Sequence, residues 1–175
     1  MLRDLIVHEE IVISRVASQV WPYILAPNTW KMGPVLEHRH GFTGRCGELF
    51  AAVSPGSSQT LFYAQNVEVC PSKRRTIKLL RDDRNTLLGY ASWCLRESEG
   101  TTTVTYDVYV QALESLEACE VMTDGTAAKE LTDSGPSRFL QELQNLKRLV
   151  EHGQTLRASK TDDSSILSVG NSTDA

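Results

Sequence analysis

Apolar and polar positions alternate imperfectly from Leu5 to Ser14, in a stretch rich in Ile and Val. This pattern favours a strand over a helix. Between Val35 and Gln111, six further apolar runs are separated by short segments that contain Gly, Pro, Asn, Asp or Ser. Connections this short permit antiparallel hairpins but leave no room for crossover helices. The chain therefore predicts one strand followed, after a break, by a meander of about six antiparallel strands.

Two other segments have the pattern of helices. Residues 137–152 place Phe, Leu and Val at spacings of three and four, which predicts an amphipathic helix closed by Gly153. A shorter helix is expected after the first strand, where Ser14 or Ser18 could cap it. Pro22 would confine that helix to its first turn or bend it.

This order of elements is typical of an α+β domain, in which the last helix packs across one face of a curved, seven-stranded antiparallel sheet. We assign the domain to residues 1–153. Residues 154–175 are rich in Ser, Thr and Asp and contain no aromatic residue, so we expect a disordered C-terminal tail. One amphipathic helix cannot cover seven twisted strands. A cavity is therefore expected between helix and sheet unless side chains fill it.

Composition narrows the class of protein. The 175 residues suit one domain, and 18 Lys and Arg against 22 Asp and Glu remove the basic surface of a nucleic-acid-binding protein. No uncharged apolar run approaches the roughly 18 residues of a membrane-spanning helix. The charged first ten residues do not fit a signal peptide. We expect a soluble, cytoplasmic protein without a nucleic-acid partner.

The cysteines and a search for known catalytic motifs point to no specific chemistry. Cys46, Cys70, Cys94 and Cys119 lie far apart and form no CxxC pair, so we expect reduced thiols and neither a metal site nor a disulfide framework. The sequence contains no GxSxG, P-loop, GxGxxG or HExxH motif. Hydrolase, kinase and dinucleotide-dependent activities therefore lack support, and we expect no cofactor.

Five short segments carry a resemblance: Ala17–Trp21, Pro27–Trp30, Gly41–Gly47, Gly100–Thr102 and Leu146–Arg148. Over about residues 4–152, the chain resembles the START-like superfamily, also called SRPBCC. This group includes polyketide cyclases and dehydrases, lipid-transport proteins and birch-pollen-allergen proteins. The resemblance implies the helix-grip fold, in which the curved sheet wraps around the long C-terminal helix. It also implies a deep apolar pocket beneath that helix, to which we assign Phe139 and Leu143.

Alternation along the strands indicates which other side chains face the pocket. On this basis we place Tyr63, Gln65, Trp93 and Tyr106 in its lining. A phenol next to an amide on an apolar strand face indicates a hydrogen-bonding partner inside. In the alternative interpretation, Trp93 and Tyr106 are ordinary core residues whose polar tips are satisfied.

The phase of the strand that holds Tyr63 and Gln65 has a second interpretation. Shifting the strand by one residue would turn Phe62, Ala64 and Asn66 inward in their place. The side chains assigned to the pocket therefore depend on a phase that the alternation leaves open.

Two histidines are the candidate proton-transfer groups. His38 and His40 are two residues apart and so share one face of their expected strand. Histidine transfers protons well near neutral pH, so either could serve as the base in a ring closure. Tyr63 and Arg81 could then hold the oxyanion. Alternatively, the histidines belong to an exposed basic hairpin and Arg81 is a solvated residue at a strand end.

From these features we expect a small, cofactor-free, polyketide cyclase-like enzyme of secondary metabolism. It would promote ring closure of an apolar intermediate in the pocket, by aldol condensation or by lactonisation to a pyrone. The alternative is non-catalytic binding or transport of a lipid, sterol or quinone. A third interpretation is a co-chaperone-like interaction domain with a filled interior. The expected partner is a small apolar ligand or polyketide substrate, and a homodimer stays open.

Overall fold

The computed structural model describes residues 3–111 and 138–153, so the predicted tail and the segment before the last helix lie outside it. The described chain forms one antiparallel sheet in the order β1-β7-β6-β5-β4-β3-β2. This is the predicted meander, and β1 pairs with β7. The strands are β1 (Arg3–Ile13), β2 (Val35–His40), β3 (Leu49–Val53), β4 (Thr60–Cys70), β5 (Arg74–Leu80), β6 (Leu87–Ser98) and β7 (Thr101–Gln111).

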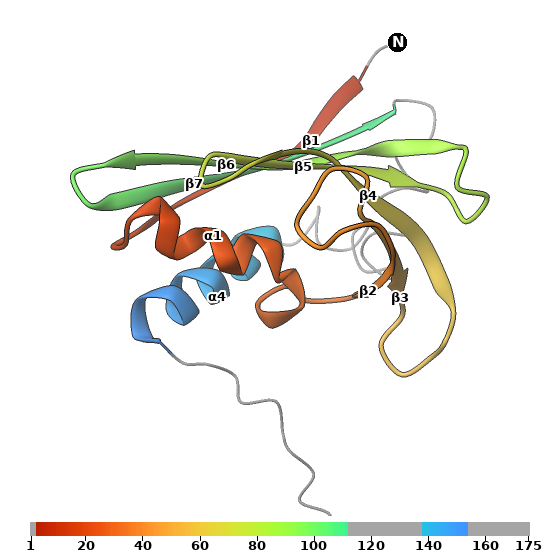
Figure 1. Ribbon diagram of the computed structural model, residues 1–175, viewed down its shortest axis with the longest axis horizontal. Coiled ribbons are helices and arrows are strands. Elements are labelled where there is room, and N and C mark those ends of the chain that lie inside the picture. Colours follow the sequence, from red (N-terminus) through yellow and green to blue (C-terminus); the bar gives the residue numbers. More distant parts are fainter. Residues whose placement is uncertain (1–2, 112–137, 154–175) are drawn as a thin grey trace, which may run out of the picture.

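Two α-helices lie on the same face of this sheet, and the end that carries β2 and β3 bends toward them (Figure 1). They are α1 (Ala17–Leu25), which leads into the short 3-10 helix η1 (Pro27–Thr29), and α4 (Arg138–His152). α4 packs mainly against β1. The arrangement confirms the predicted α+β class and its helix-grip form. No helix among the described residues is long and apolar enough to cross a membrane.

The start of α1 differs from the prediction. Neither Ser14 nor Ser18 caps the helix, because Val16 occupies the cap position. Instead, the backbone N–H of Ala17 donates to the carboxylate of Glu97 on β6 at 2.9 Å. A carboxylate there satisfies a free N–H of the first turn and suits the positive end of the helix. Pro22 does not end α1, which continues to Leu25.

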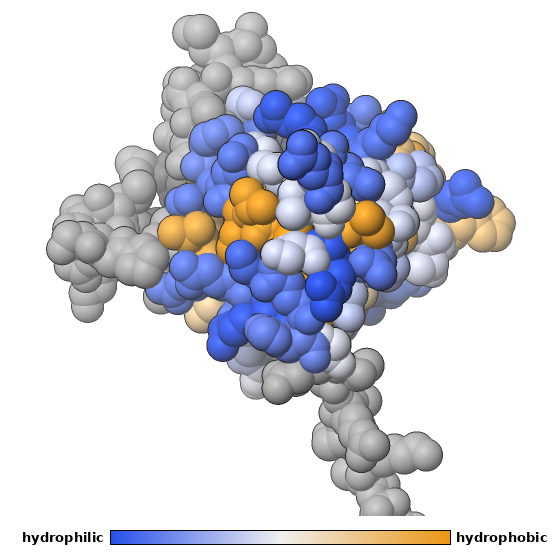
Figure 2. Space-filling view, turned by 90° about the vertical axis from the view of Figure 1, so that its left-hand side faces the viewer, coloured by the Kyte–Doolittle hydropathy of each residue, from blue (hydrophilic) through white to orange (hydrophobic). Residues whose placement is uncertain are grey.

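The covered face of the sheet carries the core. Leu143 and Leu146 of α4 and Ile24 of α1 are at most 1% exposed, and they belong to one apolar cluster with the inward side chains of the sheet. The end of the molecule formed by the β6–β7 turn and the start of α1 is mainly hydrophilic, with several apolar patches across its middle (Figure 2).

The predicted phase of β4 is wrong, and the alternative phase is the one observed. Phe62, Ala64 and Asn66 are buried, whereas Tyr63 and Gln65 lie on the opposite, partly exposed face. Apolar residues occur on both faces of this strand, so its hydrophobic pattern does not distinguish the two phases. Polar contacts beneath the sheet distinguish them, because Asn66 has its partners there.

A buried polar chain connects β4 and β5 with the β2–β3 loop and α1. Arg75 Nε donates to Asn66 Oδ1 at 2.9 Å, and Asn66 Nδ2 donates to Glu48 Oε2 at 3.0 Å. Arg75 Nη1 donates to the carbonyl oxygen of Ile24 at 2.7 Å, and Gly44 N donates to Glu48 Oε2 at 2.7 Å. Burial lowers the pKa of Arg75 to about 10, so the guanidinium stays charged at neutral pH. This chain fixes the β2–β3 loop and the end of α1 to the sheet.

The observed phase of β4 predicts unequal costs for two neighbouring substitutions. Phe62→Ala removes a side chain that is 6% exposed and should lower the free energy of unfolding by about 3 kcal/mol or more. Tyr63→Ala removes a partly exposed side chain and should cost about 1 kcal/mol or less. Urea denaturation of the two variants measures the difference. Equal costs, or a larger cost at Tyr63, would restore the phase first predicted from the sequence.

Candidate functional site

A cavity of about 40 Å³ lies between the sheet and α4. Its walls come from β4 to β7, the segment that follows Trp30, and the first residues of α4. A space of this size holds a water molecule or two. It is much smaller than the deep pocket that the resemblance implies.

Aromatic side chains pack against one another beside the cavity. The rings of Trp93 and Tyr106 are stacked, with centroids 4.9 Å apart, and Trp30 meets Trp93 edge-on at 6.4 Å. Phe139 of α4 packs against Tyr106 with centroids 5.7 Å apart. These contacts leave a small gap, and its chemistry depends on the polar groups around it.

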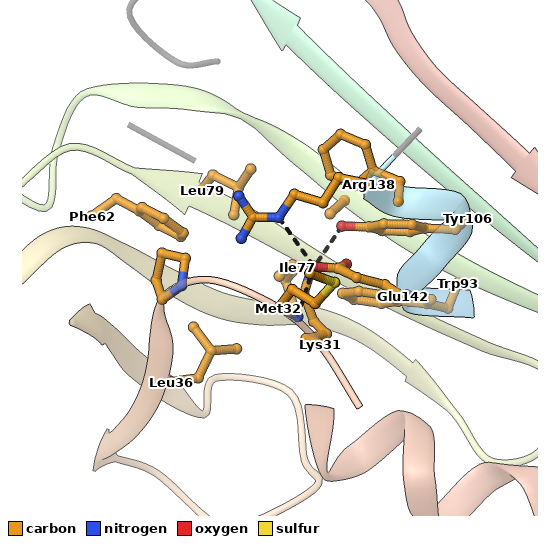
Figure 3. A pocket seen from close by; sticks show the side chains of 13 residues that line it. Lys31, Met32, Leu36, Phe62, Ile77, Leu79, Trp93, Tyr106, Arg138 and Glu142 are labelled. Atoms are coloured by element: carbon orange, nitrogen blue, oxygen red, sulfur yellow. Dashed lines mark hydrogen bonds and ion pairs between the residues drawn. The ribbon is translucent and has the colours of Figure 1, made fainter. Parts of the chain in front are cut away.

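The cavity has a polar side and an apolar side (Figure 3). Lys31, Tyr106 and Glu142 gather on the polar side, whereas Phe62 and Leu36 lie on the other. An amphipathic molecule matches this division, with its apolar part on one side and its polar group on the other.

Lys31 is the centre of the polar side. Its Nζ atom donates to the hydroxyl oxygen of Tyr106 at 3.0 Å and lies 3.5 Å from Glu142 Oε2. The other carboxylate oxygen, Oε1, accepts from the backbone N–H of Met32 at 3.0 Å and lies 3.8 Å from Arg138 Nε. The side chain of Glu142 is 2% exposed and that of Lys31 is 21% exposed. Two cations thus share one buried carboxylate.

The protonation states follow from this arrangement. Burial alone lowers the pKa of Lys31, but the Glu142 carboxylate and the Tyr106 phenol outweigh burial, so the pKa lies above its ordinary value. Burial raises the pKa of Tyr106 against the opposing charge of Lys31. At neutral pH the site therefore holds an ammonium and an uncharged phenol. A protonated Lys31 can polarise an oxygen but cannot act as a nucleophilic amine.

Two buried polar atoms of the cavity lining have no hydrogen-bond partner within the part of the chain that the structure describes. They are Trp93 Nε1 and Glu142 Oε2, although Lys31 is close enough to the latter for an ion pair. Buried donors and acceptors are nearly always paired in proteins. These two atoms therefore mark the cavity as a place where a polar guest would be stabilised.

Gly33 allows Arg138 to take its position at the cavity. A Cβ atom at Gly33 would lie 1.8 Å from Arg138 Nη2, and its φ of +89° is one that favours glycine. The guanidinium reaches from α4 toward Phe62 and Leu79 on the apolar side (Figure 3). Close contact between Gly33 and Arg138 therefore holds the first turn of α4 against the segment after Trp30.

Three of the residues predicted from the sequence, Trp93, Tyr106 and Phe139, line the cavity. Leu143, which was also assigned to the pocket, is fully buried in the core and does not line the cavity. Arg81 is half-buried directly after β5 and does not line the cavity, although Leu79 does. A role of any of these residues in ligand binding stays a prediction.

The other predicted residues lie away from the cavity. Tyr63 and Gln65 face outward: Arg84 donates to the phenol of Tyr63 at 3.1 Å and so lowers its pKa, and Gln65 donates to a loop carbonyl. His38 and His40 are exposed on β2, and an irregularity in the pairing with β3 lies between them. The structure thus does not bring these four side chains to one site.

Sequence reasoning missed Lys31, Arg138 and Glu142. The sequence did contain a signal for Arg138 and Glu142. Both lie on the side of the predicted helix that holds its apolar residues. A charged residue in such a position requires a buried partner. For Lys31 there was no such signal, since it follows Trp30 in an irregular segment.

Cys46, Cys70 and Cys94 are free thiols. Within residues 3–111 and 138–153, no group of three or more His, Cys, Asp or Glu side chains could hold a metal ion.

No protein-family model matches this sequence, and no curated protein matches it either. Solved structures do resemble it. The chain matches protein MLL2253 from Mesorhizobium loti with a TM-score of 0.57 and 13% identity, over 85% of this chain and 98% of that one. It matches the Aha1 dimer from Colwellia psychrerythraea with a TM-score of 0.56 and 13% identity, over 89% and 100%. Norcoclaurine synthase from Thalictrum flavum matches at 0.50 and 13%, over 85% and 87%.

These likenesses concern the fold. Three proteins that share about one residue in eight with this chain have the same arrangement of sheet and helices. The chain therefore has the helix-grip fold, and the resemblance to START-like proteins is confirmed as a likeness of fold. Fold alone does not determine activity.

The ion pair at the cavity predicts a non-additive pattern of stabilities. Lys31→Met leaves Arg138 as the one remaining cation beside the buried Glu142 carboxylate among the described residues, which should lower the free energy of unfolding by about 2 to 4 kcal/mol. Glu142→Gln keeps an acceptor for the N–H of Met32, so the double variant should be more stable than Lys31→Met alone. Urea denaturation of the four proteins measures this coupling. Additive losses would show that the two side chains do not interact.

The raised pKa of Lys31 predicts a loss of stability in alkali. Lys31 binds its proton more tightly in the folded than in the unfolded state, so its contribution is complete below the unfolded pKa and is lost as pH rises through the folded one. Wild type should therefore lose more stability than Lys31→Met as pH rises above the ordinary lysine pKa of 10.5. Denaturation at a series of pH values tests this. Lys73→Met, at an exposed lysine, should follow wild type.

Proposed function

We propose that this protein is a cofactor-free, polyketide cyclase-like enzyme whose active groups are Lys31, Tyr106 and Glu142. The observation that carries the proposal is a half-buried ammonium beside a buried phenol and a buried carboxylate, gathered at a cavity between sheet and helix. Charged groups in such a place are costly for folding alone, which is why they are candidates for function. Norcoclaurine synthase has the same fold, so the fold is compatible with an enzyme.

The geometry supports an aldol type of ring closure. The Glu142 carboxylate takes a proton from a carbon between two carbonyl groups of the substrate. The Lys31 ammonium and the Tyr106 phenol stabilise the negative charge on the enolate oxygen. The enolate carbon then attacks a second carbonyl of the same molecule, forming the new carbon–carbon bond. The resulting alkoxide takes up the proton that Glu142 received, so the protein is unchanged at the end.

Binding requires the cavity to enlarge. A diketide or triketide is larger than the present 40 Å³, so the substrate must displace side chains of the lining. Met32 is 43% exposed and lies at the edge of the cavity, beside Arg138. We place the entrance there, between the segment after Trp30 and the start of α4. A homodimer is compatible with this proposal, because the Aha1 neighbour is a dimer of the same fold.

A short β-polyketo thioester is the test substrate, with ring-closed product followed by mass spectrometry. Glu142→Gln should slow ring closure by about 100-fold or more, the usual contribution of a proton-transfer group. Tyr106→Phe should also slow it, whereas Tyr63→Phe, the matched change on the outer face, should leave the rate within about twofold.

Two results would contradict the proposal. The first is a rate with wild type equal to that in buffer, together with an unchanged lipid retained in native mass spectrometry, which would support a carrier. The second is a loss of activity in Tyr63→Phe or His38→Ala but not in Glu142→Gln, which would move the site to the residues first predicted from the sequence.

A further inference from the structure

The indole N–H of Trp93 is a buried donor at the cavity that has no hydrogen-bond partner among the described residues. Trp93 is 1% exposed, and its Nε1 atom has no acceptor within the described part of the chain. Trp30 shows the usual situation, since its Nε1 atom donates to the carbonyl oxygen of Tyr23 at 2.7 Å. Trp30 is 2% exposed and Trp93 1% exposed. Their different hydrogen bonding therefore does not come from a different degree of burial.

The Trp93 ring cannot turn to find an acceptor. Tyr106 stacks on it with an interplanar angle of 6°, and Trp30 meets it at 88°. Two cations lie near the ring: Lys31 Nζ is 5.4 Å and the Arg75 guanidinium carbon 5.8 Å from its centroid. The indole N–H therefore has no acceptor among the described residues and lies in a site that also holds the Lys31 ammonium.

We infer that the ligand of this cavity presents an oxygen acceptor, such as a carboxylate or an enolate, to the indole N–H of Trp93 and to Lys31. This inference rests on the proposed function for the position of the site, and it adds the chemistry of the recognised group. An oxygen there pairs the buried donor and also lies beside the ammonium, which has a third N–H beyond those directed at Tyr106 and Glu142. A hydrocarbon leaves both donors unpaired.

Three probes of similar size separate these cases: benzoate, acetophenone and ethylbenzene. The readout is the indole N–H region of a proton–nitrogen correlation spectrum of the full chain, in which Trp93→Phe assigns the signal of Trp93. Benzoate and acetophenone should shift that signal downfield and leave the signal of Trp30 in place. Benzoate should bind at least tenfold more tightly than ethylbenzene.

Variants test the same assignment by affinity. Trp93→Phe keeps the ring and removes the N–H, so it should weaken benzoate binding by roughly 2- to 10-fold and leave ethylbenzene unaffected. Lys31→Met should weaken benzoate more than acetophenone. Trp21→Phe, a tryptophan of α1 outside the lining, is the control and should bind all three probes as wild type does.

The outcomes distinguish this inference from the proposed function. Equal affinities for the three probes with an unmoved Trp93 signal would overturn the inference and mean that water alone serves the indole, while ring-closing activity could persist. Shifts of Trp93 as expected in a protein without turnover support the inference and contradict the enzyme. If none of the probes binds, the cavity is not a ligand site and both ideas fail.

Discussion

The structure depends on the burial of one face of the sheet under α1 and α4. That contact shields the apolar side chains of this face from water, and it also shields polar side chains that lie on the same face. Such side chains must find their partners inside. Two sets of them do so: the chain through Glu48, Asn66 and Arg75, and the cluster around Lys31 and Glu142. Their positions follow from the apolar contact.

The two buried sets differ in how completely they are paired. In the first, Arg75 and Asn66 reach defined acceptors on neighbouring elements, and the chain acts as a structural connection between loop, sheet and α1. In the second, Glu142 Oε2 and the neighbouring Trp93 Nε1 lack hydrogen-bond partners among the described residues. The requirement that buried polar groups be hydrogen-bonded is met in the first set and not fully met in the second. We therefore interpret the first as a structural network and the second as a candidate site. The gathered charged groups carry the proposed function, and the incomplete pairing of Trp93 carries the inference about its ligand.

The cavity of this protein is small, so a ligand would have to displace side chains in order to bind. Between the curved sheet and α4, the rings of Trp30, Trp93, Tyr106 and Phe139 pack against one another, and a cavity of about 40 Å³ is left beside them. Dense aromatic packing fixes the polar atoms at its edge in defined directions. A ligand would therefore meet preorganised donors, at the cost of displacing side chains near Met32 and Arg138.

The sequence by itself determined the elements and their order. Short turns between apolar runs allow only hairpins, and the spacing of Phe139, Leu143 and Leu146 allows only a helix with one apolar side, because these are local properties of the chain. The face of β4 that turns inward was decided by tertiary structure, since both of its faces are apolar and only Asn66 meets partners beneath the sheet. The site was decided in the same way. Lys31 and Glu142 are 111 positions apart, and only the packing of α4 over the sheet brings their charges within 3.5 Å.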